Sequence, residues 1–260
     1  MSLTMNKITF IVTAAITAAT STAVQAQHVD IAVLVENGRI VTAADLGAGL
    51  AAQRVFSADF GELGVPDFTD EPGFVAPPGT FAVGSRTGFN VTAGLRRFNG
   101  TACEPVANER IEASFLTLAT MIGAEPSAGF DLAVQSDGGW HRHLGFTLLA
   151  DGGKLPPSGI YVAELELYST DGVTAPSAPF WIVFNDERTE LEHDAAIAWV
   201  EANLATTPCP TDLDGNGDTG SSDLATLLSA WGTSTADLTG DGNTDSADIA
   251  ALLSAWGTCG

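Results

Sequence analysis

Apolar and polar residues alternate along most of the chain between residues 28 and 185, as in strands that bury one face. In the first such run, 28–35 (HVDIAVLV), the odd-numbered positions are apolar, and His28 and Asp30 share the opposite face. Asn37-Gly38 follows before another apolar run, which predicts a tight hairpin. Further strand-like runs occupy 54–60, 81–84, 88–98, 110–118, 130–135, 140–149, 160–169 and 179–185. This pattern predicts a mainly β domain over residues 27–205, an antiparallel β-sandwich or jelly roll.

Two segments depart from the strand period. Residues 61–79 are rich in Gly and Pro, and we expect a long irregular loop there. Residues 190–204 follow a helical period instead, and Thr189 and Glu192 form a capping box at its start. The helix face that should dock on the sheet, with its histidine pointing inward, comprises His193, Ile197, Val200 and Leu204.

The C-terminal residues 206–260 are organised differently, because the segment LLSAWGT occurs at 227–233 and again at 252–258, 25 residues later. A short repeat of this kind indicates a duplicated structural unit. Each copy has an acidic, Gly-punctuated loop followed by an apolar helical segment. A disordered acidic tail with chance Asp spacing is the alternative, and the two matching helical segments argue against it.

The spacing of the acidic residues fits calcium. Ca²⁺ takes about six to eight oxygen ligands, which a loop of about 12 residues supplies from alternate positions and its last position, with Gly at the sixth. The first predicted site comprises Asp212, Asp214, Asn216, Asp218 and Asp223, with a water expected beside Gly220. The second comprises Asp237, Thr239, Asp241, Asn243, Asp245 and Asp248. We therefore expect two Ca²⁺ ions in this module.

Asp at the last loop position and a single helix after each loop resemble the type I dockerins, duplicated loop–helix modules that bind two calcium ions. The resemblance covers residues 209–260 and implies a cohesin-like or other protein partner. Ser221-Ser222 and Ser246-Ala247 stand where that family often has a Ser-Thr recognition pair. This departure leaves the identity of the partner open.

The first 26 residues carry an apolar run after Lys7 and end in Val24-Gln25-Ala26, which predicts a signal peptide cleaved before Gln27. The run is short and Thr-rich for a membrane span. We expect a secreted, periplasmic or cell-surface protein without a membrane span. In that oxidising environment Cys209 and Cys259, which flank the repeat, are expected to form a disulfide. Cys103 is then left as a buried free thiol or an intermolecular bridge.

The formal net charge of −22 argues against nucleic acid and anionic membranes as partners, since both require basic surfaces. The C-terminal repeat contributes eight Asp and has no Lys or Arg. Acidic surfaces are usually only solvated, so the charge excludes these partners and indicates nothing more specific.

The four histidines of the chain lie at three places: His28, the pair His141 and His143, and His193. A His-x-His sequence on a strand puts both imidazoles on one face. One hypothesis is a zinc or copper site built from this pair and His193, with His28 or Glu166 as the fourth ligand, because imidazole suits both metals. The alternative is a solvated pair on a strand and a hydrogen-bonded core histidine.

The candidacy of Glu166 depends on an expected hairpin in which Leu149 pairs near Ile160, which puts His143 opposite Glu166. Glu164 and Glu166 also suggest the two carboxylates of a glycosidase. They would be only about 7 Å apart along one strand, with no sugar-stacking pattern around them. We favour structural roles for both.

Four segments of the β domain are similar to an uncharacterised secreted family known mainly from cyanobacteria and planctomycetes: HVDIAVLVENGRIVT, GGWHRHLGFTL, PFWIVFN and EHDAAIAWV. Some members of that family are described as zinc-regulated and carry a C-terminal sorting segment. The resemblance covers most of residues 28–203 and implies a zinc-linked role. It also implies that the ligands are His28, His141, His143 and His193. This chain ends in a dockerin-like repeat instead, so its mode of attachment differs.

No nucleophile or nucleotide motif of the GxSxG, Walker or HExxH kind is present. We therefore expect an exported, non-catalytic protein that binds zinc or copper and attaches to a partner through a calcium-binding module. The alternative from another class is a secreted polysaccharide hydrolase that carries a dockerin. A structural scaffold with neither property is the third possibility.

Overall fold

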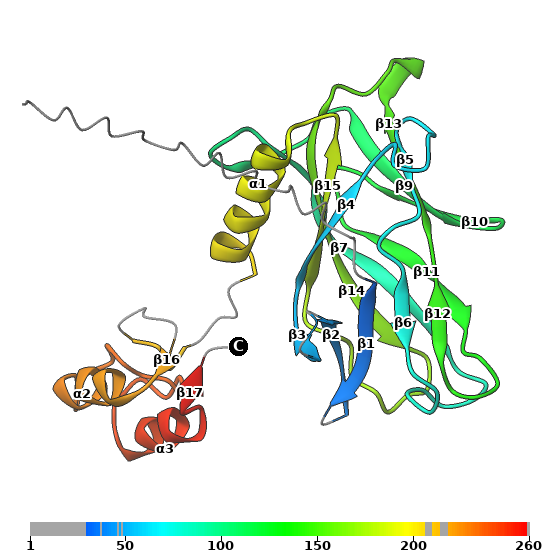
Figure 1. The fold of residues 1–260 in the computed structure, drawn as a ribbon. Coiled ribbons are helices and arrows are strands. Elements are labelled where there is room, and N and C mark those ends of the chain that lie inside the picture. The colour runs from blue at the N-terminus through cyan, green and yellow to red at the C-terminus, as the bar shows by residue number, and fades with distance from the viewer. Residues whose placement is uncertain are drawn as a thin grey trace, which may run out of the picture.

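The computed structural model describes residues 30–36, 38–45, 47, 49–205, 210–213 and 218–258. Within these residues the protein is mainly β, with mixed and antiparallel sheets and three α-helices (Figure 1). Among the described residues, no helix has the length and apolar character needed to cross a membrane. The predicted signal peptide, His28, Cys209 and Cys259 lie outside the described residues.

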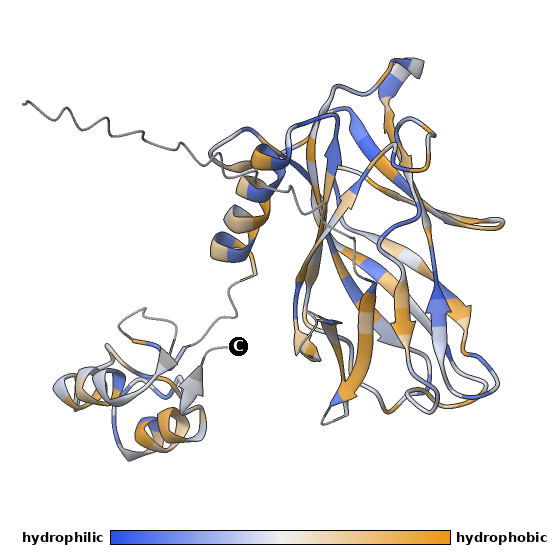
Figure 2. Cartoon of the chain, viewed as in Figure 1, coloured by the Kyte–Doolittle hydropathy of each residue, from blue (hydrophilic) through white to orange (hydrophobic). Residues whose placement is uncertain are grey.

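The first sheet has the strand order β12-β6-β1-β2-β3. Its strands are β1 (Ile31–Glu36), β2 (Arg39–Asp45), β3 (Leu50–Ala52), β6 (Phe74–Ala76) and β12 (Trp140–Arg142). β1 and β2 form the predicted hairpin, with Glu36 opposite Arg39 and Gly38 at a φ of 77°. Figure 2 shows β1 as an almost continuous apolar run, in keeping with its central place in the sheet.

Two further sheets complete the β-rich part. The four-stranded sheet contains, in order, β10 (Leu118–Ile122), β9 (Glu109–Phe115), β13 (Gly145–Ala150) and β5 (Phe68–Thr69). The six-stranded sheet contains β11 (Ser127–Ala133), β7 (Arg86–Phe98), β14 (Gly159–Ser169), β15 (Phe180–Asp186) and β4 (Val55–Asp59), and β8 (Cys103–Pro105) pairs with β7. Burial raises the pKa of the Cys103 thiol to about 11, which favours its protonated form at neutral pH.

Residues of all three sheets meet in one apolar core. The ring of Phe74 on β6 lies 5.8 Å from that of Trp140 on β12 and 6.2 Å from that of Phe180 on β15. Phe146 on β13 contacts Phe184 on β15 at 5.1 Å between ring centroids. Burying one such side chain contributes about 1.5–3 kcal/mol, so this core fixes the relative positions of the sheets.

The helix α1 (Glu190–Asn203) begins at the predicted capping box, in which Thr189 and Glu192 each bond the other's backbone N–H. It packs on β4, β14 and β15, where Val200 joins Val55 and Val183 in a second apolar cluster. His193 is 2% exposed, so the prediction that it points inward is confirmed.

Several strand predictions are wrong, and the reason is long-range pairing. The expected hairpin of 140–149 with 160–169 does not form, because β13 pairs with β9 and β5 while β14 pairs with β7 and β15. Residues 151–159, with Pro156-Pro157, carry the chain from one sheet to another instead of closing a turn. The run 110–118 divides into the hairpin β9–β10, and 140–149 divides into β12 and β13.

The purely antiparallel arrangement is also wrong, because β6 is parallel to β1 and β4 is parallel to β15. The segment 61–79, predicted to be an irregular loop, contains β5 and β6. Burial of Phe74 and Ala76 outweighs the turn preference of its Gly and Pro residues. The run 81–84 forms a turn, in which Ser85 N–H donates to the carbonyl of Ala82 at 3.1 Å.

The described C-terminal residues form two helices, α2 (Ser221–Ser229) and α3 (Ser246–Ser254), and two short paired strands, β16 (Asp218–Thr219) and β17 (Gly257–Thr258). Leu227 of α2 and Leu252 of α3 are fully buried and pack together with Ala236 in a small core of their own. The two repeat copies therefore pack against each other through equivalent leucines.

Candidate metal centre

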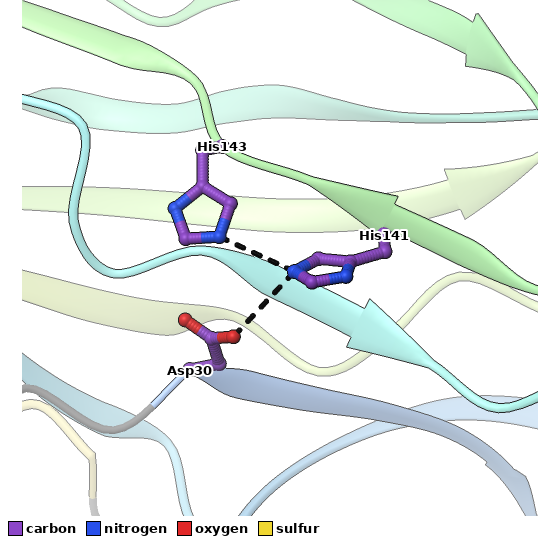
Figure 3. Close-up of side chains that lie close together, drawn as sticks. All are labelled: Asp30, His141 and His143. Carbon is purple, nitrogen blue, oxygen red and sulfur yellow. Dashed lines mark hydrogen bonds and ion pairs between the residues drawn. The ribbon is translucent and has the colours of Figure 1, made fainter.

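His141 and His143 lie together where the chain passes from β12 towards β13. Their Nε2 atoms are 3.2 Å apart, and Asp30 Oδ2 is 3.7 Å from His141 Nε2 (Figure 3). The first sheet brings these residues together, because β6 lies between β1 and β12. Ile31 pairs with Phe74 and Phe74 pairs with Arg142, so the next residues outward are Asp30, Gly73 and His143.

Gly73 allows the cluster to close. A Cβ atom at this position would lie 2.5 Å from the Cε1 atom of His143 and 2.8 Å from Asp30 Oδ1, so any side chain here must displace these groups. The backbone N–H of Gly73 donates to Asp30 Oδ1 at 3.2 Å and to Glu71 Oε2 at 3.1 Å. A glycine here therefore both leaves space for the imidazole and orients two carboxylates.

The surroundings of His143 determine which of its nitrogens carries the proton. Its Nδ1 lies 3.2 Å from the carbonyl oxygen of Asp70, which can only accept, so Nδ1 donates. Glu71 Oε1 lies 3.5 Å from the same nitrogen. His143 Nε2 is then left with its lone pair facing His141. Histidines that bind metals are typically held in this way by a carbonyl or carboxylate on the other nitrogen.

Glu71 is partly withdrawn from solvent. Burial raises the pKa of its carboxyl group, against the lowering effects of the Gly73 N–H bond and of nearby His143, while Asp30 and Asp70 raise it further. Glu71 contacts the nitrogen of His143 that faces away from His141, so it can orient the imidazole without binding the same ion.

The distances within the cluster suit a small tetrahedral ion. Zinc–nitrogen bonds of about 2.0–2.1 Å place two tetrahedral ligands about 3.3 Å apart. The separations of 3.2 and 3.7 Å within the cluster are close to this value. The side chains of His141, His143 and Asp30 are 52%, 35% and 32% exposed, so an ion held by them would keep a position open to solvent. Without an ion the same geometry is a hydrogen bond from His141 Nε2–H to His143 Nε2.

The structure separates the predicted zinc or copper ligands into different places. His141 and His143 come together, His193 belongs to a separate cluster with Asp59 and Glu190, and His28 lies outside the described residues. Glu166 is opposite Asn90 of β7, in the six-stranded sheet, so the pairing that placed it opposite His143 is wrong.

Sequence reasoning missed Asp30, Glu71 and Gly73 as members of the cluster. Asp30 shares a strand face with the candidate ligand His28, but the sequence does not place that face beside His141 and His143. Nothing in the sequence points to Glu71 and Gly73, because they lie in the segment predicted to be an irregular loop.

The second acidic loop of the repeat is described in full. Asp237 accepts hydrogen bonds from the backbone N–H groups of Gly240, Asp241 and Gly242. Asp248 is fully buried and accepts from those of Leu238, Thr239 and Asp245. These bonds, led by Gly242 N–H for Asp237 and Asp245 N–H for Asp248, lower the pKa of both carboxyl groups. Gly242 has a φ of 92°, which a side chain would strain.

The first acidic loop is described only in part. Asp214 and Asn216 lie outside the described residues, and Asp218 is described by its backbone, which pairs with Thr258. Asp223 is fully buried and accepts from the N–H groups of Leu213 and Gly220, both at 2.7 Å. Its position and its bonds match those of Asp248 in the second copy.

Two pockets lie apart from the histidine pair. One of about 550 Å³ is lined by Arg97, Glu104, Arg188 and Glu192 among others, and Arg188 pairs with Glu192. The other, of about 250 Å³, is lined by Asp67, Asp186 and Glu187. Burial, together with the charges of Asp67 and Glu187, raises the pKa of Asp186 to about 6 against the lowering effect of Arg97.

No family model matches this chain, and no curated protein matches it in sequence.

Proposed function

We propose that this is an exported, non-catalytic protein that binds zinc at Asp30, His141 and His143, with copper as the second candidate. The observation that carries the proposal is the 3.2 Å separation of the two Nε2 atoms, with the proton of His143 held at its other nitrogen. Two imidazoles and one carboxylate form a ligand set suited to zinc or copper.

The setting of the pair favours binding over catalysis. Active sites are usually concave and enclose their substrate. His141 is about half exposed, and both pockets described above are lined by other residues. An exposed site with one open position suits capture or storage of an ion, or a bridge to a ligand on another molecule.

We further propose that residues 27–205 form a β-sandwich and that residues 206–260 form a dockerin-like module, ordered by two Ca²⁺ ions, which attaches the protein to a partner. The backbone bonds to Asp237 and Asp248 support this, because they keep both carboxylates ionised and oriented. Four apolar side chains, equivalent in the two repeat copies and about half exposed, offer a contact surface: Leu228, Trp231, Leu253 and Trp256.

The zinc proposal is tested by titrating the full chain with zinc in excess calcium, which keeps zinc out of the acidic loops. The variant His141→Ala/His143→Ala should bind one zinc fewer than the wild type. Glu166→Gln is the control, because Glu166 lies on another sheet, and it should bind as the wild type does. Equal zinc stoichiometry in the double variant and the wild type would overturn the proposal.

The calcium proposal is tested by calorimetric titration of the full chain after chelation. We expect two sites, of which Asp212→Ala and Asp237→Ala should each remove one, with Asp45→Ala as an exposed control on β2. A chain that binds no Ca²⁺, or that binds two equivalents in both variants, would contradict it.

A hydrolase is the second candidate function, and the pocket with Asp67 and Asp186 favours it. Glycosidases use two carboxyl groups with different pKa values. Release of sugars from a polysaccharide by the metal-free chain, abolished in Asp186→Asn, would establish the hydrolase in place of the non-catalytic role.

A further inference from the structure

We infer that Asp59, Glu190 and His193 form a second metal-binding site, for a zinc-type divalent ion, where α1 begins against β4 and β15. The ligand atoms of these three residues all lie within 4.8 Å of one another. The residues come from the end of β4 and from the first turn of α1. The inference goes beyond the proposed function, since it shares no residue with the exposed histidine pair.

The orientation of His193 is the principal observation. Its imidazole is 2% exposed, and its Nε2 lies 2.9 Å from the carbonyl oxygen of Val183. A carbonyl can only accept, so Nε2 donates and Nδ1 is the nitrogen that remains. Nδ1 lies 3.7 Å from Asp59 Oδ1, beyond hydrogen-bond length.

A lone pair on Nδ1 that faces two carboxylates is stabilised by a cation between them. Two cations are possible, a proton on Nδ1 or a metal ion. A proton would be expected to draw Asp59 into a hydrogen bond shorter than 3.7 Å. A metal ion requires that wider separation, because its ligands sit about 3.3 Å or more apart.

The carboxylates are positioned by the same elements that hold the histidine. Asp59 Oδ1 accepts a hydrogen bond from Asn185 Nδ2 at 2.7 Å, and Asn185 Oδ1 accepts from the backbone N–H of Arg188 at 3.0 Å. Glu190 precedes His193 by three residues on α1, so both lie on one side of the helix. The carbonyl of Val183 and the side chain of Asn185 therefore orient His193 and Asp59 before any ion binds, and the first turn of α1 places Glu190 beside them.

The chemistry of the donors selects the ion. One imidazole and two carboxylates suit zinc, whereas Ca²⁺ prefers oxygen ligands alone. The start of a helix disfavours a cation by about 0.3–1 kcal/mol. That cost is small beside the roughly 10 kcal/mol or more with which structural zinc sites bind. Glu190 is exposed, so an ion can enter from the solvent side of the cluster.

The test uses the full chain in excess calcium with the His141→Ala/His143→Ala background, which removes the first zinc site. Zinc chloride is the probe, followed by competition with a chromophoric chelator and by NMR of the histidine ring nitrogens. We expect one zinc equivalent to remain, bound through Nδ1 of His193 with a proton still on Nε2.

Glu190→Gln is the main variant, because Glu190 is exposed and its replacement should not disturb folding. We expect it to weaken the remaining zinc roughly tenfold or more, as loss of a ligand should cost at least as much as loss of an outer partner. Asp194→Asn removes one exposed negative charge four residues further along the same helix and is the matched control, with an expected change under about twofold.

Three outcomes would overturn the inference: no zinc bound in the double-histidine background, zinc bound equally by Glu190→Gln, or a proton that stays on Nδ1 of His193 in the presence of zinc. Each outcome is distinguishable from failure of the exposed site, which is measured by the zinc that the double variant loses.

Discussion

The two histidine clusters use opposite ring nitrogens. His143 donates from Nδ1 to the carbonyl of Asp70 and leaves Nε2 facing its neighbour, whereas His193 donates from Nε2 to the carbonyl of Val183 and leaves Nδ1. The first cluster lies at the strand ends of the first sheet with its side chains partly exposed, and the buried histidine of the second packs between α1 and β15. In both clusters a backbone carbonyl orients the imidazole. Only the imidazole of His193 is buried, so we expect only that ring to stabilise the fold as well.

The largest effect should come from His193→Ala. Its ring is buried against β15, so the substitution removes a hydrogen bond and leaves a cavity. We expect a loss of about 2–4 kcal/mol in the free energy of unfolding, from urea unfolding of the full chain with zinc chelated and calcium constant. His141→Ala should change it by about 0.5 kcal/mol or less. Similar losses in both variants would remove the distinction between the clusters.

Asp186, at the end of β15, should make the stability of the folded protein depend on pH. It is 4% exposed, and burial raises the pKa of its carboxyl group to about 6. The folded protein then holds this proton more tightly than the unfolded chain. The resulting stabilisation is complete below about pH 4 and is lost as the pH rises through about 6.

Asp186→Asn should therefore match the wild type in stability at pH 4 and exceed it at pH 8. We expect a gain of roughly 1–2 kcal/mol, less than the whole shift, because solvent in the adjoining pocket screens the charges. Urea unfolding at the two pH values measures this. Asp194→Asn is the exposed control, and a gain of the same size at both pH values would contradict the account.

The exposed cluster should respond to changes that leave the fold intact. Gly73→Ala adds one methyl group, which would lie 2.5 Å from the ring of His143 and must displace that ring. We expect zinc affinity to fall roughly tenfold or more while the unfolding midpoint changes little. Gly123→Ala is the matched control, because a Cβ there meets nothing within 4 Å. Zinc affinity that is the same in both variants would show that the packing around Gly73 does not position the imidazole.

The hairpin of β1 and β2, the capped helix α1 and the contact of His141 with His143 could all be predicted from the sequence. Each depends on neighbours within a few residues, and local patterns encode such contacts. Asp30 and Gly73 could not be placed with the pair, because a parallel pairing of β1 with β6 brings them together. No local signal fixes a partner that lies about forty residues away.

The same reason explains the mistaken role of Glu166. The alternating pattern predicts on which face of its strand Glu166 lies. That face identifies the neighbours of Glu166 only when the adjacent strand is known. β14 pairs with β7 and β15, not with β13, so Glu166 is in a different sheet from the histidines. Residue chemistry was therefore easier to predict than the sheet to which each strand belongs.

The smallest effect should come from Glu71→Gln, which probes how the exposed imidazole is held. Gln keeps the size of the side chain and its ability to accept a hydrogen bond, and it removes the charge that lies 3.5 Å from His143 Nδ1. Zinc affinity should fall about threefold to tenfold, since the carbonyl of Asp70 still orients the ring.

If Glu71 had only a structural role, its substitution would change the stability of the protein and leave the orientation of the His143 ring unchanged. Nitrogen NMR of His143 separates the two cases, because a positioning role predicts a larger fraction of the Nε2–H tautomer in Glu71→Gln. An unchanged tautomer with unchanged affinity would assign the whole orientation of His143 to the backbone, as His193 is oriented by Val183.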